Sequence, residues 1–224
     1  MIYMTNYLFT CVGMVYMIGD KVVSGKERMC ACMDYVEKTL ENICFISEDL
    51  EGVSFQGCIL NNCLFQKCNL RNCNFQSAVF YGCRIEDSHI EGADFLGASL
   101  NDMKLENVHA DDTTKYFYLA CPEEGPFVAY KKCQDDRIVQ MLVPKDALRS
   151  SATRLTCRCS KAKVLSIKSI DETVKYTEAV ATIDDSFIYR VGEWVEVDNF
   201  DTNRWHDAAP GIHFWMTREQ AIHY

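Results

Sequence analysis

The sequence predicts a mainly β protein, in which a short β-solenoid has a helical cap before it and a small α+β domain after it. Three observations lead to this prediction. Large apolar residues recur at every fifth position within residues 43–109, apolar residues before them follow a helical spacing, and the residues after 116 show strand patterns. We therefore divide the chain into an N-terminal segment with a capping helix at 1–42, a solenoid at 43–109 and a C-terminal α+β domain at 116–224.

The first nineteen residues carry no charge and many apolar side chains. They lack the basic stretch and the small-residue cleavage motif of a secretory signal, and they are marginal in length for a membrane span. We therefore expect a buried strand or hairpin at 1–19, and a protein that does not enter a membrane.

A capping helix is predicted between this segment and the solenoid. Ser24 and Glu27 have the spacing of a capping box. A helical stripe of apolar residues follows, made of Met29, Met33, Val36, Leu40 and Ile43. We expect a helix from 25 to 41 that lays this stripe over the first coil, because the end coil of a solenoid otherwise exposes an apolar face.

The solenoid itself is predicted by a period of five, which fits neither the 3.6 of a helix nor the 2 of a strand. Every fifth residue is large and apolar: Phe45, Leu50, Phe55, Leu60, Phe65, Leu70, Phe75, Phe80, Ile85, Ile90, Phe95, Leu100 and Leu105. The residue two before each of the later ones is small: Cys58, Cys63, Cys68, Cys73, Ala78, Cys83, Ser88, Ala93 and Ala98. Such self-similarity indicates stacked repeats.

The units Cys-Asn-Leu at 68–70, Cys-Asn-Phe at 73–75 and Ala-Asp-Phe at 93–95 resemble the pentapeptide-repeat family, whose units read roughly A-D/N-L-x-x. The resemblance implies a right-handed parallel β-helix in which four units form one square coil, with the large residue inward and the small one packed beside it. Residues twenty apart should then stack, as Phe55, Phe75 and Phe95 would. About three coils, each ~4.8 Å high, give a solenoid ~15 Å tall.

The chain has 13 cysteines, an odd number that does not suggest the disulfide framework of a secreted domain, so we expect a reducing, cytoplasmic location. Five of them occupy small inward positions of the repeat, where a free thiol acts as a compact hydrophobe: Cys58, Cys63, Cys68, Cys73 and Cys83. A metal ladder is disfavoured, because Ala and Ser take the same positions.

The C-terminal domain is predicted from strand patterns. Segments 127–134 and 137–143 flank Asp135 and Asp136 and indicate a β-hairpin. A capping box of Thr217 and Gln220 predicts a short final helix. Further strands are expected at 157–167, 174–183, 187–191 and 194–197, with a turn at 192–193 and a helical turn at 145–149.

Three segments of this domain resemble an uncharacterised domain that often follows pentapeptide repeats in bacterial and bacteriophage proteins. They are PKDALRSS at 144–151, CRCSKAKV at 157–164 and GIHFWMTREQAIHY at 211–224. The resemblance covers most of 121–224. It implies a phage or mobile-element origin but no chemistry.

The sequence contains no glycine-rich phosphate loop and no G-x-S-x-G or H-E-x-x-H motif. Cys157 and Cys159 with His206 and His213 lack a recognised zinc spacing, so we expect no metal and no cofactor. A nucleophilic Cys157 with His213 as its base rests on residue types alone, and a structural histidine is the preferred interpretation. We assign no catalytic residue.

One basic, hydroxyl-rich stretch is the candidate ligand site, because guanidinium groups beside hydroxyls suit phosphate or nucleotide recognition. The alternative is a solvated loop with surface ion pairs. Trp205 could stack on a base or belong to the core, and His213 lies near it in the sequence. The stretch comprises Arg149, Ser150, Ser151, Thr153, Arg154, Arg158 and Lys161.

The formal net charge of −9 argues against a general nucleic-acid or anionic-membrane binder. We favour a non-enzymatic interaction or inhibitor protein, encoded by a phage or mobile element, that binds a host or defence target on the rigid solenoid. The alternative is a protein that binds or sequesters a small nucleotide signal through the basic stretch, and an enzyme in the C-terminal domain ranks third.

Some pentapeptide-repeat proteins mimic DNA, but this solenoid is short for that role and holds only 9 acidic against 4 basic residues within 44–109. The family resemblance also implies an end-to-end homodimer.

Overall fold

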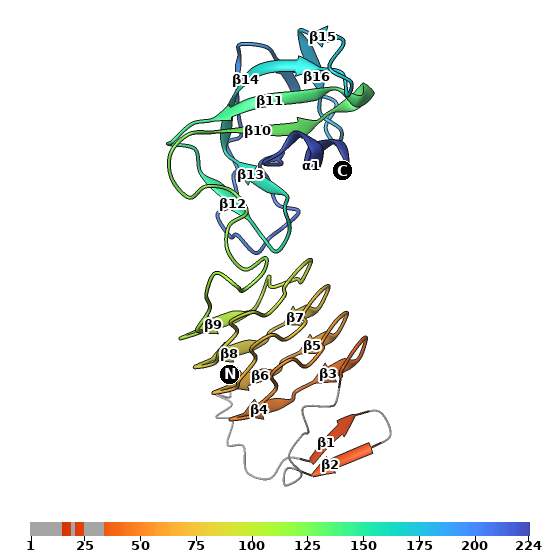
Figure 1. Cartoon of the computed structure of the whole chain (residues 1–224), viewed down its shortest axis with the longest axis vertical. Coiled ribbons are helices and arrows are strands. Elements are labelled where there is room, and N and C mark those ends of the chain that lie inside the picture. The colour runs from red at the N-terminus through yellow and green to blue at the C-terminus, as the bar shows by residue number, and fades with distance from the viewer. Residues whose placement is uncertain (1–14, 19–20, 25–33) are drawn as a thin grey trace, which may run out of the picture. The chain divides into compact units, whose positions relative to one another are not determined.

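The computed structural model of the chain describes residues 15–18, 21–24 and 34–224. It divides into two compact units, coloured from red to blue along the chain in Figure 1. The first unit runs to residue 93 and includes 102–114, and the second combines 94–101 with 115–224. The segment 94–101 therefore continues the repeat in sequence but belongs to the C-terminal unit by its contacts.

Two short strands precede the solenoid. β1 (Val15–Ile18) and β2 (Lys21–Ser24) pair antiparallel, with Val15 opposite Ser24. Residues 15–18 of the segment 1–19, where we expected a buried strand or hairpin, form one strand of this hairpin, whereas 1–14 and 19 lie outside the described residues.

The solenoid is built from columns of parallel three-residue strands, which Figure 1 shows stacked coil on coil. Paired residues lie twenty apart in the sequence, as Phe45 and Phe65 do, which confirms the β-solenoid of about three coils. One side is made of β3 (Thr39–Glu41), β5 (Ile59–Asn61) and β7 (Val79–Tyr81). The next side is made of β4 (Cys44–Ile46), β6 (Leu64–Gln66), β8 (Arg84–Glu86) and β9 (Lys104–Glu106).

Stacked aromatic rings fill the solenoid interior. The ring centroids of Phe45 and Phe65 lie 4.7 Å apart, and those of Phe55 and Phe75 lie 5.1 Å apart, both pairs with nearly parallel planes. The two columns also meet edge to face, since Phe55 lies 5.7 Å from Phe65 at 89°. Both arrangements are favoured by the ring quadrupole, so the repeat of large inward residues is stabilised both along and across the stack.

The inward cysteines do more than fill space. Each of the five donates its S–H to a backbone carbonyl oxygen 23 residues earlier in the chain, those of Tyr35, Leu40, Phe45, Leu50 and Leu60. The Ser88 hydroxyl donates to the carbonyl oxygen of Glu86 at 2.7 Å and lies 3.4 Å from that of Phe65, 23 residues earlier. Burial raises the pKa of the Cys68 thiol to about 11 and that of Cys73 to about 12, so both thiols stay protonated and tie neighbouring coils together.

The predicted capping helix at 25–41 is wrong over its described part. Residues 36–37 form a turn and 39–41 form β3, while 25–33 lie outside the described residues. Tyr35 and Leu40 instead extend the five-residue repeat by two positions. The Tyr35 ring stacks on Phe55 at 5.0 Å, and Leu40 pairs with Leu60. The two patterns share Leu40, but the helical stripe would have buried Val36, which is 41% exposed.

The C-terminal domain contains three small sheets. The largest has the order β10–β11–β14–β15, with β18 also pairing β14. Its strands are β10 (Phe127–Lys132), β11 (Ile138–Val143), β14 (Lys161–Lys168), β15 (Lys175–Tyr176) and β18 (Trp194–Glu196). The second sheet joins β12 (Arg149–Ser151), β13 (Cys157–Cys159) and β19 (Ile212–Phe214), and the third joins β16 (Glu178–Val180) and β17 (Ile188–Arg190).

Most predicted elements of this domain are present. The hairpin of β10 and β11 turns through a short 3₁₀ segment, Gln134–Asp136, and the final helix α1 (Arg218–Ile222) has the predicted capping box. Three predictions need correction. The strand expected at 157–167 is divided at Ser160 into members of two different sheets, and the strand expected at 174–183 is likewise divided at Thr177 into β15 and β16. Residues 145–147 form a turn that leads into β12 instead of a helical turn. Among the described residues, no helix has the length and apolar character that crossing a membrane requires.

Candidate functional site

The solenoid presents one side whose outward residues are polar in every coil. We call this side the ladder face. Its residues lie next to the inward Leu50, Leu70 and Ile90, so the repeat that turns those side chains inward turns their neighbours outward. One column contains Asp49, Asn69, His89 and His109, linked by parallel bridges, and the second contains Glu51, Arg71, Glu91 and Asp111.

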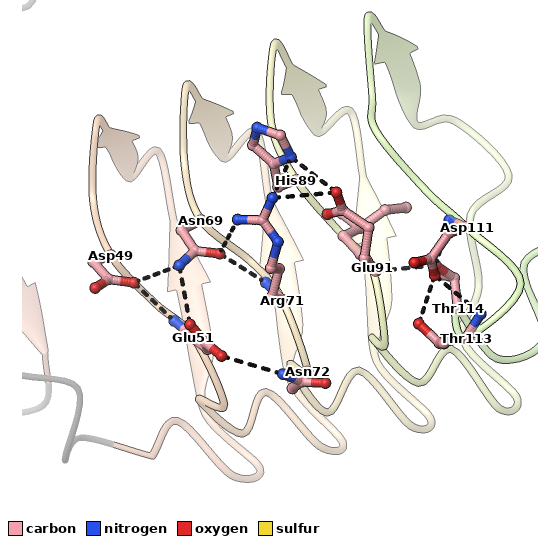
Figure 2. Close-up of polar contacts among 11 residues, drawn as sticks. Asp49, Glu51, Asn69, Arg71, Asn72, His89, Glu91, Asp111, Thr113 and Thr114 are labelled. Carbon is pink, nitrogen blue, oxygen red and sulfur yellow. Dashed lines mark hydrogen bonds and ion pairs between the residues drawn. The ribbon is translucent and has the colours of Figure 1, made fainter.

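At the N-terminal end of the ladder face, two carboxylates are joined by asparagine side chains, as Figure 2 shows. The amide of Asn69 donates to Asp49 Oδ1 at 2.8 Å and to Glu51 Oε2 at 3.3 Å. The amide of Asn72 donates to the other oxygen of Glu51 at 3.3 Å. Successive coils are therefore connected by side chains on the outside as well as by the stacked core.

An arginine, a histidine and a glutamate meet at the centre of the ladder face (Figure 2). Arg71 Nη2 donates to Glu91 Oε1 at 3.2 Å and lies 2.8 Å from His89 Nδ1. His89 Nδ1 in turn lies 3.0 Å from Glu91 Oε1, so the three side chains contact one another in pairs. The second carboxylate oxygen, Glu91 Oε2, is buried and has no hydrogen-bond partner among the described residues.

The C-terminal end of the ladder face is closed by a stacked pair and a short polar loop. The rings of His89 and His109 lie 4.6 Å apart with an interplanar angle of 18°. Asp111 Oδ1 accepts hydrogen bonds from the backbone and the hydroxyl of Thr113, and the Thr114 hydroxyl donates to the carbonyl oxygen of Ile90 at 3.2 Å. These contacts hold the last acidic side chain of the ladder in place.

The net negative charge of the chain is carried by the solenoid. Residues 34–114 contain 14 acidic and 5 basic residues, which gives a formal charge of −9, the same as that of the whole chain. The acidic residues lie in the first and last coils, since 52–85 contain none. The ladder face follows this pattern, with Arg71 between Glu51 and Glu91.

The basic stretch predicted to bind a ligand serves mainly as internal bracing. Arg149 donates to five backbone carbonyl oxygens, those of Pro122, Gly125, Pro144, Lys145 and Ala147. Arg158 is 2% exposed and donates to three carbonyl oxygens of one loop, those of Asp201, Asn203 and Pro210. Donors that are already paired with carbonyl groups are not free to bind a phosphate.

The structure does bring three of the predicted residues into one row. Ser150 pairs with Arg158, and Arg158 pairs with His213, across β12, β13 and β19. The Ser150 hydroxyl is buried and lacks a partner among the described residues. Burial lowers the pKa of His213, whose Nε2 lies 3.4 Å from the carbonyl oxygen of Asp207.

The other predicted ligand residues are dispersed. The Ser151 hydroxyl accepts from the backbone of Ala120, and the Thr153 hydroxyl donates to the carbonyl oxygen of Ala98. Arg154 pairs with Asp207 at 3.2 Å, Lys161 pairs with Asp146 at 2.7 Å, and Trp205 packs 5.8 Å from Phe117 with Arg204 over its ring. The nucleotide-binding alternative therefore stays a prediction that these contacts do not favour.

Cys157 and His213 lie on opposite faces of their sheet, because His213 pairs with Arg158, the strand neighbour of Cys157. A hydrogen bond with Cys121 and burial raise the pKa of Cys157. Within residues 34–224, no three His, Cys, Asp or Glu side chains are grouped as a metal ion would require.

The sequence predicted a binding surface on the solenoid but did not identify the ladder face as that surface. The signal that could have found it is the twenty-residue spacing of the outward positions, which aligns Glu51, Arg71 and Glu91 in one column. A charge alternation at that spacing predicts contacts between coils, just as cross-strand pairs stabilise a sheet.

Two families match separate parts of the chain. Residues 49–87 and 73–109 match the family described as pentapeptide repeats, and residues 117–221 match a family of unknown function, DUF5758. No curated protein matches the chain.

Three solved structures are similar over the repeat. A pentapeptide repeat protein from the cyanobacterium Cyanothece 51142 has 21% identity and a TM-score of 0.21, covering 36% of this chain and 62% of that one. A plasmid-mediated fluoroquinolone resistance protein has 19% identity and a TM-score of 0.22, covering 37% and 52%. A pentapeptide repeat protein of the Arabidopsis thaliana thylakoid lumen has 18% identity and a TM-score of 0.17, covering 31% and 63%. The chain thus spans less than two thirds of the length of each.

Proposed function

This chain belongs to the pentapeptide-repeat proteins and carries a C-terminal domain of the DUF5758 family, and on that basis we propose that it is a non-enzymatic interaction protein. The ladder face is the surface that binds the partner. Its defined side-chain contacts across the coils are the observation that supports this proposal most directly.

A surface of this kind is suited to binding because its side chains are held in place before the partner arrives. The Arg71, His89 and Glu91 contacts fix three polar groups on a stack whose interior is filled by rings and hydrogen-bonded thiols. Groups that are already ordered lose little conformational entropy on binding. A rigid polar face therefore favours recognition of one arrangement of partner charges.

The charge of the solenoid indicates the chemistry of the partner. A formal charge of −9 over 34–114 favours a basic protein surface, and long-range attraction would speed the encounter. In the narrower form of this proposal, the chain is an inhibitor encoded by a phage or mobile element, and the basic surface belongs to a host or defence protein.

The test uses the full chain with an affinity tag to capture partners from a cell lysate, followed by titration of the purified partner against variants. Glu91→Lys reverses a charge on the ladder face, and Glu41→Lys is the matched control on β3, on another side of the solenoid. We expect Glu91→Lys to weaken binding at least about tenfold and Glu41→Lys to leave it near the wild-type value. We also expect the wild-type affinity to fall as salt is added.

Equal affinities for the wild type and both variants would remove the ladder face from the proposal. Circular dichroism of each variant establishes that it folds, so that a lost interaction is not confused with a lost structure.

A further inference from the structure

A hollow of about 90 Å³ lies on the large sheet of the C-terminal domain, and its lining includes no residue of the ladder face or of the predicted basic stretch. The lining includes the buried Ile138, and most of the other lining side chains carry hydrogen-bonding or charged groups. The lining residues are Tyr130, Ile138, Gln140, Ser166, Lys168, Glu172 and Arg218. Neither the sequence patterns nor the two families assign a role to them.

One wall of the hollow is a row of three side chains on adjacent strands. Tyr130 is the direct partner of Gln140, and Gln140 is the direct partner of Ser166. The Ser166 hydroxyl donates to Gln140 Oε1 at 3.0 Å, and Gln140 Nε2 donates to the Tyr130 hydroxyl oxygen at 3.3 Å. Because the Tyr130 oxygen already accepts, its own O–H remains available, and the contacts of the described residues include no acceptor for it.

A second wall of the hollow is made of two cations around one carboxylate. Lys168 Nζ donates to Glu172 Oε2 at 2.7 Å, and Arg218 Nε lies 3.4 Å from Glu172 Oε1. The Arg218 Nη2 group is anchored on the carbonyl oxygens of Ser169 and Ile170, at 2.9 and 2.6 Å. The Nη1 group and two hydrogens of Lys168 have no acceptor among the described contacts, so this wall also offers free donors.

Glu172 shows which kind of chemical group these two cations bind. It adopts a φ of 61°, in the left-handed region that a residue with a side chain seldom occupies, and this places it in the turn after β14. The hydrogen bond from Lys168 and the charges of Lys168 and Arg218 lower its pKa. The chain thus supplies one carboxylate to this wall and leaves a formal charge of +1 over Lys168, Glu172 and Arg218.

From these contacts we infer that the hollow binds a second oxyanion, the carboxylate or phosphate group of a small ligand, between the Tyr130 hydroxyl and the Lys168 ammonium group. The size sets a limit on this ligand. A volume of 90 Å³ is well below the ~300–1,000 Å³ of pockets that enclose a drug-sized molecule. Only the anionic end of a larger ligand would be enclosed.

Isothermal titration of the full chain with inorganic phosphate, and separately with acetate, tests the inference at constant ionic strength. We expect saturable binding of at least one probe, and the tighter of the two identifies the preferred oxyanion. Tyr130→Phe removes one donor and keeps the ring, and Lys168→Met removes the cation and keeps the chain length. Each should weaken binding about tenfold, because each removes a hydrogen bond to a charged group. Lys163→Met, on the same strand β14 but outside the lining of the hollow, is the matched control.

A variant that should strengthen ligand binding separates an effect on binding from a loss of stability. Glu172→Gln keeps a hydrogen-bond acceptor for Lys168 but removes the competing negative charge, so it should strengthen phosphate or acetate binding about tenfold. Saturable binding that weakens in the first two variants and strengthens in Glu172→Gln would support the site. The inference is overturned by absent saturation in the wild type, by equal affinities across the variants, or by the same weakening in Lys163→Met.

Discussion

Phe65 allows the interior packing of the solenoid to be tested quantitatively. The side chain is fully buried, its ring lies 4.7 Å from the parallel ring of Phe45, and it meets Phe55 and Phe75 edge to face at 5.7 and 6.4 Å. Replacing a buried phenylalanine with alanine costs about 3–5 kcal/mol of unfolding free energy. The lost ring contacts place Phe65→Ala in the upper part of this range, about 4–5 kcal/mol.

Phe65→Leu provides a graded comparison, because leucine already fills the same inward position at Leu60 and Leu70. It keeps most of the volume and loses the ring contacts, so we expect a cost of about 1–1.5 kcal/mol. Tyr81→Ala is the surface control. Tyr81 lies on β7 and is 54% exposed, and its replacement should cost less than about 1 kcal/mol.

Guanidinium unfolding can be followed with two probes that report on different units. All three tryptophans, Trp194, Trp205 and Trp215, lie in the C-terminal unit, so their fluorescence follows that domain, whereas far-ultraviolet circular dichroism follows both units. We expect Phe65→Ala to shift the dichroism transition and to move the fluorescence transition much less. A loss below about 1 kcal/mol, similar to that of Tyr81→Ala, would refute the stacked-interior reasoning.

Three further predictions follow from single contacts. Arg158→Met removes three hydrogen bonds to carbonyl oxygens and should destabilise the C-terminal domain by about 3 kcal/mol in the fluorescence transition, and an unchanged midpoint would contradict the bracing role. Gly92→Ala places a Cβ 2.2 Å from Asn72 Oδ1, whereas Gly52→Ala, at the same φ of 73°, meets nothing within 4 Å. Gly92→Ala should therefore cost more than Gly52→Ala by about 1 kcal/mol or more, and equal costs would show that the Asn72 contact is unimportant. Burial raises the pKa of Cys73 to about 12, so its alkylation at pH 8, followed by mass spectrometry, should be at least ~1,000-fold slower than that of a free thiol, and rapid labelling of the folded chain would disprove its protection.

Much of the fold could be predicted because the repeat is a local signal. A large residue at every fifth position identifies the inward side chains without knowledge of which segments meet, and the structure buries Phe45, Leu60 and Ile85 as expected. The N-terminal limit could not be predicted in the same way. Leu40 fits both a helical stripe and the repeat, and only the pairing with Leu60 decides between them.

The candidate sites were harder to predict because their contacts join distant parts of the chain. From the sequence, Arg149 and Arg158 could each be a phosphate ligand. An arginine that is free to bind a ligand and one whose guanidinium group is already bonded to the protein are the same residue in the sequence. Their acceptors are carbonyl oxygens as far as 27 residues from Arg149 and 52 residues from Arg158. The hollow at Tyr130 is likewise lined by residues of β10, β11, β14, the turn after β14 and α1, which no local pattern brings together.

The sequence alone determined that the chain contains a short solenoid and which of its side chains point inward, because these properties repeat within five residues. Only the tertiary structure decided what the outward and polar groups do. Arg71 meets His89 and Glu91 because one coil of the solenoid is twenty residues long, and Arg158 braces a loop because that loop folds back over its strand. Burial follows from a local pattern, whereas the partner of a hydrogen bond depends on which distant segments the fold brings together.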